Sequence, residues 1–327
     1  MSSVSIIVPC YNEQTTIHEL LNAIYHQTYP RSKIAVIIAD GMSTDGTRQA
    51  IKNFQLEHPD LSIQVVDNVH QTIPSGLNQA IKASSDEFIV RLDAHSAPLT
   101  NYVESCVEAL QSDLGDNVGG VWQIEPGGEG RQARAIAVAA AHPLGVGDAL
   151  YRIGGDAQKV ETVPFGAFRR SLVDHLGYYD ETLLANEDYE FNTRIRESGG
   201  TVWFDPNIRS IYYARSTLST LAVQYWRYGF WKARMLRRYP RTLRWRQLLP
   251  PLFVISLFLL GLLALVIPAA FWLIIFEIGL YVVVLLTVGI QVAAKNRDII
   301  MILNVPFAIA TMHISWGVAF IWSFIKS

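Results

Sequence analysis

Between Leu248 and Ala294 the sequence carries only one charged side chain, that of Glu277. A helix needs about 20 apolar residues to cross the hydrocarbon core of a bilayer. This stretch is therefore long enough for two membrane spans, and we expect Pro268 to divide them. Because only part of the 327-residue chain has this character, the sequence predicts a folded domain followed by a membrane-seeking tail.

A third apolar segment, Ile299 to Ile325, is a weaker candidate for a membrane span because it contains three unusual residues. These are Asn304, Pro306 and His313. Glu277 and His313 would be costly if they faced lipid, and we interpret both as polar contacts between helices without further function. The basic loop from Lys295 to Arg297 favours a hairpin that returns to the cytoplasmic side. The sequence leaves open whether the last segment spans the membrane.

A block of basic residues precedes the apolar tail. Eight lysines and arginines, and no acid, lie between Arg227 and Arg246. Directly before an apolar run, such a block marks the cytoplasmic side of a membrane helix and favours anionic lipid headgroups. Aromatic and basic residues mix at helical spacing from Thr217 to Tyr239, which indicates a helix in the membrane interface. We expect no nucleic-acid partner, because the block adjoins a hydrophobic segment.

The first hundred residues alternate between short apolar runs and helical patterns. The expected strands are Val4 to Val8, Ile34 to Ala39, Ile63 to Val66 and Phe88 to Leu92. The expected helices run from Thr15 to His26, from a cap at Asp45 to about Leu56, and from Ser75 to Ala83. This alternation predicts an α/β fold with a mostly parallel sheet and helices on both faces.

Acidic residues follow the ends of these strands. Ligands of parallel sheets bind beyond the carboxyl ends of the strands. The segment Pro9 to Glu13, Asp40 and Asp93 all fall at such ends. We therefore expect them to converge on one cleft, although they are far apart in the sequence.

The pattern is less regular after residue 115. Expected strands are Gly119 to Ile124, Thr162 to Phe165 and Thr201 to Phe204, and expected helices are Arg131 to His142 and a segment from Glu187 to about Ser198. Pro143 to Asp156 is interpreted as a glycine-studded loop. The resulting domain prediction is a catalytic domain over residues 1–213, an amphipathic interface region over 214–247 and a membrane region over 248–327.

Composition limits the remaining possibilities. The formal net charge of −2 averages a soluble domain and an apolar tail. Cys10 and Cys106, the two cysteines, lie in apolar patterns and form no disulfide framework or zinc spacing. The N-terminus has no basic region before its apolar run, so we do not expect a signal peptide. The first domain is expected in the cytoplasm, with the tail in the cell's inner membrane.

Several motifs, in this order, resemble those of the family 2 glycosyltransferases, which have the GT-A fold. The first two are Ile6-Ile7-Val8-Pro9-Cys10-Tyr11-Asn12-Glu13 and Ala39-Asp40-Gly41-Met42-Ser43-Thr44-Asp45-Gly46-Thr47. Asp93-Ala94-His95 occupies the place of the metal-binding DxD motif, and Asn186-Glu187-Asp188 matches the acidic acceptor-side motif. Gln224-Tyr225-Trp226-Arg227-Tyr228 is similar to the QxxRW motif, with Tyr228 in place of the final Trp. The resemblance covers about residues 4 to 240 and is closest to the bacterial exopolysaccharide branch, including succinoglycan-type glucosyltransferases.

The resemblance implies a nucleotide-sugar site at the strand ends. Asp40 would accept a hydrogen bond from the imide N–H of uracil, beside a wall made by Pro9, Tyr11 and Glu13. Asp93 would bind a divalent cation that bridges the two phosphates. His95 replaces the second carboxylate of the motif, and imidazole favours Mn²⁺ somewhat over Mg²⁺. Arg91 would contact a donor phosphate, although an arginine at a strand edge more often pairs with a nearby acid.

The acceptor side is expected at the 186–188 motif. We interpret Asp188 as the general base that takes the proton of the acceptor hydroxyl, and Glu187 as a residue that orients the acceptor. Gln224, Arg227 and Tyr228 would close over donor phosphates or acceptor. The alternative for Glu187 and Asp188 is that they are first-turn acids favoured by the helix dipole.

These inferences predict a membrane-anchored inverting transferase. It would move one sugar, glucose by resemblance, from a UDP-sugar to a polyprenyl diphosphate-linked saccharide. A processive polysaccharide synthase is one alternative, although it is expected to need more membrane helices. A catalytically silent nucleotide-sugar-binding scaffold at the membrane is another, but Asp40, Asp93 and Asp188 are all present. A dinucleotide-binding domain is disfavoured, because no GxGxxG follows the first strand.

Overall fold

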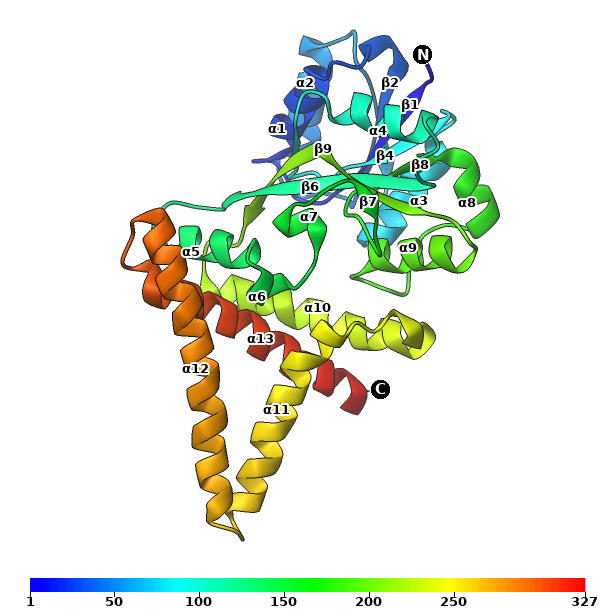
Figure 1. Cartoon of the computed structure of the whole chain (residues 1–327). Coiled ribbons are helices and arrows are strands. Elements are labelled where there is room, and N and C mark those ends of the chain that lie inside the picture. Colours follow the sequence, from blue (N-terminus) through cyan, green and yellow to red (C-terminus); the bar gives the residue numbers. More distant parts are fainter. Residues whose placement is uncertain (327) are drawn as a thin grey trace. The chain divides into compact units, whose positions relative to one another are not determined.

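Figure 1 shows a computed structural model of the chain, which describes residues 1–326. The residues group into two compact units. The first contains Met1–Gln123 and Gly154–Tyr212, and the second contains Ile124–Ile153 and the residues from Tyr213 onward. The functional division at residues 213 and 247 that the sequence predicts stays a prediction.

The first unit is built on a mixed sheet whose parallel part was predicted from the sequence. Its strands are β1 (Val4–Cys10), β2 (Ile34–Asp40), β3 (Ser62–Asp67) and β4 (Phe88–Arg91). They lie in the order β3-β2-β1-β4 and all pair in parallel. Each is connected to the next through a helix, so their carboxyl ends meet at one edge. This confirms the α/β expectation for the first hundred residues.

The sheet continues beyond β4 with strands that run mostly antiparallel. These are β8 (Ala167–Arg169), β6 (Asn117–Pro126), β9 (Val202–Ala214) and β5 (Ala97–Pro98), in that order, with β7 (Gln158–Lys159) paired to β9. Strand β8 pairs antiparallel with β4 and with β6. A short strand thus joins the parallel half of the sheet to the remainder.

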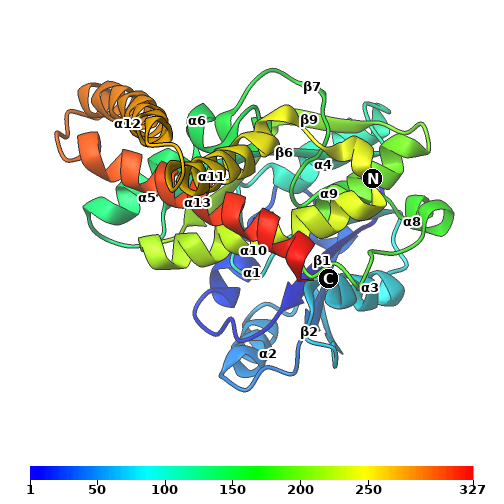
Figure 2. The ribbon, with the colours of Figure 1, turned by 90° about the horizontal axis from the view of Figure 1, so that it is seen from below.

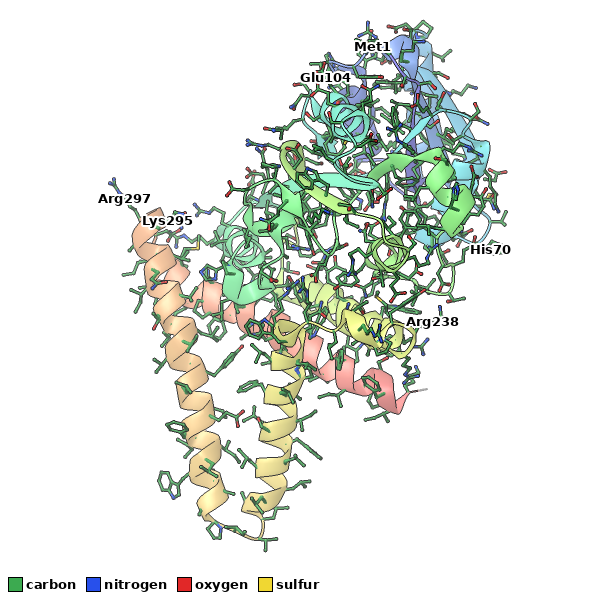
Figure 3. The ribbon with its side chains drawn as sticks, turned by 45° about the vertical axis from the view of Figure 1, so that its right-hand side comes forward. Met1, His70, Glu104, Arg238, Lys295 and Arg297 are labelled. Atoms are coloured by element: carbon green, nitrogen blue, oxygen red, sulfur yellow. The ribbon has the colours of Figure 1, made fainter. Side chains whose placement is uncertain are left out.

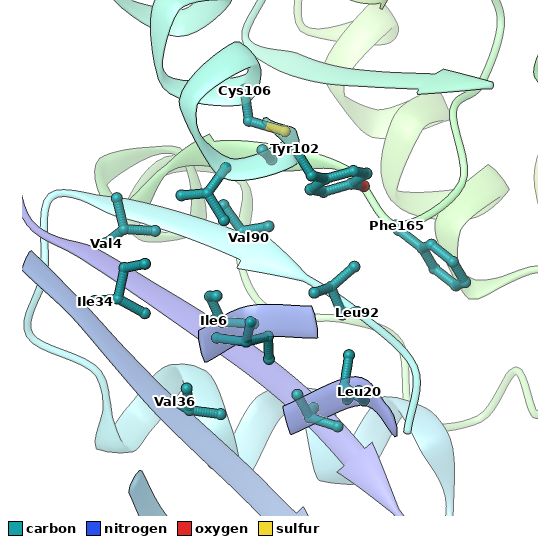
Figure 4. Packing of buried hydrophobic residues seen from close by; sticks show 14 of the residues in the cluster. Val4, Ile6, Leu20, Ile34, Val36, Val90, Leu92, Tyr102, Cys106 and Phe165 are labelled. Atoms are coloured by element: carbon teal, nitrogen blue, oxygen red, sulfur yellow. The ribbon is translucent and has the colours of Figure 1, made fainter. Parts of the chain in front are cut away.

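Helices cover the sheet and enclose its apolar strands. The main ones are α1 (Ile17–Tyr25), α2 (Thr47–Glu57), α3 (Ile73–Ala83), α4 (Tyr102–Gln111), α8 (Arg170–Leu176) and α9 (Glu187–Glu197). All seven residues of β1 are buried, as expected for a strand covered on both faces. Figure 4 shows Ile6, Val36 and Val90 of the strands packed with Leu20 of α1 in one core cluster. Burial of this apolar surface is the main stabilising contribution of such a core.

Three local predictions need correction. The N-cap of α2 is Gly46, one residue after Asp45, although the Asp45 carboxylate still accepts a hydrogen bond from the Thr47 amide at 3.0 Å. The expected loop after Pro143 contains two short helices, α6 (Pro143–Val146) and α7 (Leu150–Ile153). The strand expected at residues 162–165 begins instead at Ala167. Phe165 has a φ of 56°, which is incompatible with an extended strand.

The second unit is helical in the residues that the structure describes, apart from the strand ends that it shares with the sheet. Besides α6 and α7 it contains α5 (Arg131–Ala140), α10 (Leu218–Arg238), α11 (Trp245–Ala264), α12 (Ala269–Asn296) and α13 (Met301–Ile325). Helices α11, α12 and α13 are each long and apolar enough to cross a membrane. The break between α11 and α12 lies at Leu265 to Pro268, as predicted.

The two polar groups in the apolar tail contact neighbouring helices. The Glu277 carboxylate of α12 accepts a hydrogen bond from the Ser256 hydroxyl of α11. His313 of α13 lies 3.0 Å from the Tyr281 hydroxyl and 2.8 Å from the Leu144 carbonyl oxygen. These contacts agree with the interpretation that Glu277 and His313 join helices.

Close packing of α10 against α13 yields a test of the second unit. A Cβ added at Gly229 would lie 2.4 Å from the Trp316 carbonyl oxygen, whereas one added at Gly261 would meet nothing within 4 Å. Gly229→Ala is therefore expected to lower the free energy of unfolding by about 1–3 kcal/mol. Gly261→Ala, the same change in an open helical position, should be neutral or stabilising by up to about 1 kcal/mol. Unfolding of both variants in detergent measures the difference, and equal effects would contradict this packing.

Candidate active site

The loops that follow β1 and β2 are joined by hydrogen bonds. The Asn12 amide donates to the Ser43 hydroxyl at 2.8 Å, and the Asn12 side chain accepts from the Thr44 amide at 2.9 Å. The Glu13 amide donates to the Thr47 hydroxyl at 2.8 Å. Asn12 has a φ of 54°, a left-handed conformation that Asn tolerates better than most residues. These bonds fix the two motif-bearing loops against each other.

Asp40 is fully buried at the end of β2. Its carboxylate accepts hydrogen bonds from the Ser43 hydroxyl and from the Arg48 guanidinium, each at 2.5 Å. Arg48 also pairs with Asp67 at 2.6 Å. A uracil imide would therefore have to replace one of these donors at Asp40. The Arg48 side chain is 43% exposed, so it has room to turn toward solvent, and nucleobase recognition by Asp40 stays a prediction.

Arg91, at the end of β4, binds the acidic residues of two motifs. Its side chain is 2% exposed and its guanidinium forms ion pairs with three carboxylates. These are Asp93 at 3.1 Å, Glu187 at 2.9 Å, and Asp188. The structure thus brings Asp93 and the 187–188 pair together around one buried cation. In the structure Arg91 pairs with nearby acids, which is the alternative that the sequence analysis gave for this residue. A contact between Arg91 and a donor phosphate stays a prediction.

The electrostatics of this cluster raise the pKa of Asp188. Burial disfavours the charged carboxylate and raises its pKa, the Arg91 charge lowers it, and the charges of Glu187 and Asp93 raise it further. The resulting pKa is about 7. For Arg91, burial alone would lower the pKa, but the attraction of Asp188, Asp93 and Glu187 raises it well above its ordinary value. The cluster therefore combines a permanent cation with a carboxyl group that exchanges protons near neutral pH.

Polar contacts near the middle of α9 hold this helix, and with it Asp188, in place. The side chain of Asn192 accepts a hydrogen bond from Asn117 of β6 at 2.6 Å and donates to Thr162 at 2.9 Å and to the Val163 carbonyl at 3.2 Å. Asn117 and Asn192 are both buried. Because buried amide groups are costly to leave unpaired, this network fixes the register of α9 against the sheet.

The proposed metal ligands lie near the same edge. His95 is half-exposed, and its Nδ1 is 3.1 Å from a carboxylate oxygen of Glu13. Among residues 1–326, no group of three or more His, Cys, Asp or Glu side chains is arranged to hold a metal ion. A carboxylate and an imidazole two positions apart still fit a partial site for Mn²⁺ or Mg²⁺ whose remaining ligands would be phosphate oxygens and water.

The other predicted site residues fall in different places. Pro9 lies in β1, and Tyr11, which is 45% exposed, follows that strand. Gln224, Arg227 and Tyr228 lie on α10 in the second unit, where the Gln224 amide donates to the Tyr228 hydroxyl at 3.2 Å. Their contact with phosphates or acceptor stays a prediction.

Sequence reasoning missed four residues that shape this edge: Asn12, Ser43, Arg48 and Asp67. Asn12 and Ser43 belong to the quoted motifs, but their role in joining two loops depends on strand order. Arg48 and Asp67 form an ion pair at the ends of α2 and β3. Only the placement of β3 beside β2 would have indicated that pair.

The family model of "Glycosyl transferase family 2" matches residues 5–177, more than half of the chain. The chain belongs to glycosyl transferase family 2. The match contains the Asp40 and Asp93 motifs but ends before Asp188. Together with the site geometry, it identifies the protein as a glycosyltransferase and confirms the predicted family.

Similar proteins of this family extend over almost the whole chain. Succinoglycan biosynthesis protein ExoA of Rhizobium meliloti is 28% identical, with 98% of this chain and 94% of that protein covered. A dolichyl N-acetyl-alpha-D-glucosaminyl phosphate 3-beta-D-2,3-diacetamido-2,3-dideoxy-beta-D-glucuronosyltransferase of Methanococcus voltae is 27% identical, with 97% and 96% covered. The family 2 relatives thus include proteins of polysaccharide and of lipid-linked glycan synthesis.

Solved structures support the GT-A fold of this family 2 enzyme. Mannosyltransferase PcManGT from Pyrobaculum calidifontis, in complex with GDP-Man and Mn²⁺, has a TM-score of 0.62 at 19% identity, with 95% of this chain and 87% of that chain covered. Residues 1–349 of Staphylococcus aureus TarS with UDP-GlcNAc have a TM-score of 0.52 at 15% identity, with 94% and 91% covered. At these identities the likeness concerns the fold.

The buried position of Arg91 predicts a large stability effect. Arg91→Met would leave three carboxylates without their cation, and breaking such a buried ion pair typically costs about 3–5 kcal/mol. Arg31→Met is a matched control, because Arg31 and its partner Asp60 are 42% and 49% exposed and such surface pairs contribute about 0–1 kcal/mol. Denaturant unfolding followed by tryptophan fluorescence compares the variants. Equal stability losses would show that Arg91 is not the structural centre of the cluster.

Proposed function

We propose that this enzyme transfers a single sugar, with inversion, from a nucleotide-sugar to a lipid-linked saccharide at the membrane. Glucose from UDP-glucose is the proposed donor group, and a polyprenyl diphosphate-linked saccharide is the proposed acceptor. The observation that carries the proposal is the Arg91 cluster, in which Asp93 and Asp188 both pair with one guanidinium. We assign Asp93 to the donor side and Asp188 to the acceptor side. UDP-glucose is an α-linked donor, so transfer with inversion would give a β linkage.

Asp188 is the proposed general base. It lies in the first turn of α9, and Arg91 binds its Oδ1. Among the described residues no hydrogen bond reaches its Oδ2, so that oxygen can accept the acceptor's proton. As the acceptor oxygen forms its bond to the anomeric carbon, the bond from that carbon to the diphosphate oxygen breaks. The electron pair leaves with the nucleoside diphosphate, and the proton passes to Asp188.

Arg91 is the proposed positioning residue of this reaction. A buried guanidinium holds Asp188 in one orientation and favours its ionised form, whereas Glu187 and Asp93 oppose ionisation. Because the pKa of Asp188 is about 7, the carboxylate is a stronger base than an ordinary aspartate and is still largely available at slightly alkaline pH. Glu187, which is buried and paired with Arg91 at 2.9 Å, would orient the acceptor indirectly through that cluster.

The donor would lie over the loops that follow β1, β2 and β4. Asp40, Pro9, Tyr11 and Glu13 would recognise the base and ribose, with Arg48 moving away from Asp40. Asp93 and His95 would hold a divalent cation against the two phosphates. Bound there, the cation would offset the charge that develops on the leaving diphosphate.

Membrane attachment favours a lipid-linked acceptor. The helices of the second unit carry the candidate membrane segments, and a lipid-linked saccharide offers its hydroxyl groups close to the headgroups. The catalytic unit would face the cytoplasm, where nucleotide-sugars are made, and the tail would lie in the inner membrane. Gln224, Arg227 and Tyr228 of α10 are the proposed contacts to acceptor or phosphate.

The base assignment predicts loss of transfer in one variant. The enzyme in detergent or vesicles would be given UDP-glucose, UDP-GlcNAc and GDP-mannose with polyprenyl diphosphate-linked saccharides. Asp188→Asn should reduce product by about 10²- to 10⁴-fold, and Asp174→Asn, at an exposed position of α8, should not. In the unmodified enzyme kcat/KM, which reports on the free enzyme, should fall as the pH falls through about 7, because protonated Asp188 cannot accept a proton.

Product length and residual activity decide among the alternatives. A single added sugar is expected, and a ladder of long products would favour the processive synthase. An unchanged rate in Asp188→Asn would remove the base assignment. Binding of the nucleotide-sugars without any transfer by the unmodified enzyme would favour the silent scaffold.

The assignment of Asp93 and His95 as metal ligands predicts a loss of Mn²⁺ affinity in a second variant. His95→Ala should weaken Mn²⁺ binding by at least about tenfold in the presence of UDP, since removal of groups that support a metal site typically costs 10- to 100-fold. His70→Ala, at an exposed position marked in Figure 3, is the matched control. Calorimetric titration of Mn²⁺ measures the affinity, and chelator should abolish transfer until Mn²⁺ or Mg²⁺ is returned. Full activity in chelator would contradict the cation site.

A further inference from the structure

Helix α13 runs side by side with α10 over much of its length. Gly229 of α10 lies against the Trp316 backbone, Ala233 packs in one cluster with Phe320, and the Arg237 side chain donates to the Ser323 carbonyl at 2.7 Å. Contact positions advance by about one turn in both helices, so the two run in the same direction. Whatever angle α13 makes with a membrane, α10 therefore makes about the same angle.

Helix α10 is too basic to cross hydrocarbon beside α13. Its cationic residues are Arg227, Lys232, Arg234, Arg237 and Arg238. They occupy the stretch that contacts α13, and Arg227, Arg237 and Arg238 are exposed. Arginine and lysine at the centre of a bilayer are strongly disfavoured, whereas at the headgroup level they meet water and anionic phosphates. The pair α10–α13 is thus suited to the membrane surface.

The hairpin of α11 and α12 is oriented differently from this pair. Figure 2 shows α11 and α12 nearly end-on, whereas α10 and α13 are seen lengthwise. The contacts show where α13 crosses the hairpin: Gly317 of α13 lies against Pro250 near the start of α11, and His313 lies 3.0 Å from Tyr281 in the middle of α12. Nearer the end of α12, Gly289 lies against Ile302 of α13. Figure 1 shows the remainder of the hairpin extending away from α13. If the hairpin enters the bilayer tip first, α13 crosses the half of the hairpin that lies away from the tip.

Positive charge flanks both ends of α13. Lys295 and Arg297 precede it, as Figure 3 shows, and Arg134 of α5 pairs with Asp298 at 3.7 Å. At its other end the Arg237 guanidinium lies over the Phe324 ring, and Lys326 follows. A spanning helix would place one of these basic ends on the far side, against the preference of basic residues for the cytoplasmic side.

One face of α13 remains available to lipid. Its exposed large apolar residues are Leu303, Phe307, Ile314, Trp322, Phe324 and Ile325, and all of them except Phe324 are spaced by about one or two turns along one face. The opposite face is buried, with Val305, Ile309 and Met312 fully covered. A helix with one apolar stripe and a covered second face is suited to lie along the interface with that stripe in the acyl region.

From these contacts we propose that α13 does not cross the membrane but lies in its surface beside α10, with anionic phospholipid as its partner. The α11–α12 hairpin is then the inserting element, and the C-terminus stays on the side of the catalytic unit. The proposal rests on membrane attachment alone, so its failure would leave the sugar-transfer assignment intact.

Cysteine labelling of the full chain in sealed bacterial membrane vesicles tests the topology. The two native cysteines are buried, so a membrane-impermeant maleimide would report on Lys295→Cys, Lys326→Cys and Val266→Cys. We expect Lys295→Cys and Lys326→Cys to react from the same side. Val266→Cys, at the exposed hairpin tip, should not react from that side. Labelling of Lys326→Cys only from the opposite side, or of Val266→Cys from the shared side, would overturn the proposal.

Depth measurements distinguish the two orientations without using the C-terminus. Nitroxide labels at Leu303, Ile314 and Trp322 cover about 28 Å of helix at 1.5 Å per residue. If α13 lies in the surface, their accessibility to oxygen and to a water-soluble nickel complex should be alike. A clear maximum of depth at Ile314 would show a spanning helix.

Labels on α12 provide the control for depth. Trp272, Val283 and Ile290 are exposed and lie along the helix that is proposed to insert. A label at Trp272, nearest the hairpin tip, should therefore be deepest, and one at Ile290 should be shallowest. Transfer activity of every labelled variant is measured in parallel with the same nucleotide-sugar panel. A spanning α13 in an active enzyme would overturn the proposal and leave the proposed function standing.

Discussion

The ion pairs of Arg91 connect the parallel sheet to the helix that carries the proposed base. Removing a guanidinium from water costs several kcal/mol, and here the cost is offset by three carboxylates, one from the loop after β4 and two from α9. Because each partner alone would be an uncompensated buried charge, the strand end and the helix start are fixed together. Asp93 and Asp188 therefore share one local structure, although ninety-five positions separate them.

How much of the fold follows from sequence depends on how completely each element is buried. Strands β1, β2 and β4 are mainly apolar runs closed by Pro9-Cys10, Asp40 or Asp93, and their bounds were predicted within about two residues. The antiparallel half is built from strands as short as Ala97–Pro98 and Ala167–Arg169. Such strands have too few residues for an alternation of apolar and polar side chains to be recognised. Their place in the sheet depends on partner strands that are distant in the sequence. Helix α4 was missed although its buried residues have helical spacing.

The site shows the same division. The family motifs led us to expect Asp93, Glu187 and Asp188 in one site, whereas strand-end geometry predicted only that Asp93 lies near Asp40 and the segment Pro9 to Glu13. That Arg91 binds all three could not be read from the sequence, because it requires α9 to begin beside β4. The same holds for Asp40, whose pairing with Arg48 depends on the position of α2 over β2 and β3. Sequence motifs predict which groups act, and only the packing shows which charges already have partners.

The charge balance of the cluster gives a physical reason for a divalent cation. Three carboxylates surround one guanidinium, so the edge that would receive a diphosphate is itself negative when Asp188 is ionised. A donor carrying two phosphates would be repelled from such an edge unless positive charge came with it. Asp93 and His95 lie two positions apart in the sequence. A cation held by them would reduce that repulsion and would favour the ionised form of Asp188 at the same time. Donor binding and activation of Asp188 are then two consequences of one local electrostatic requirement.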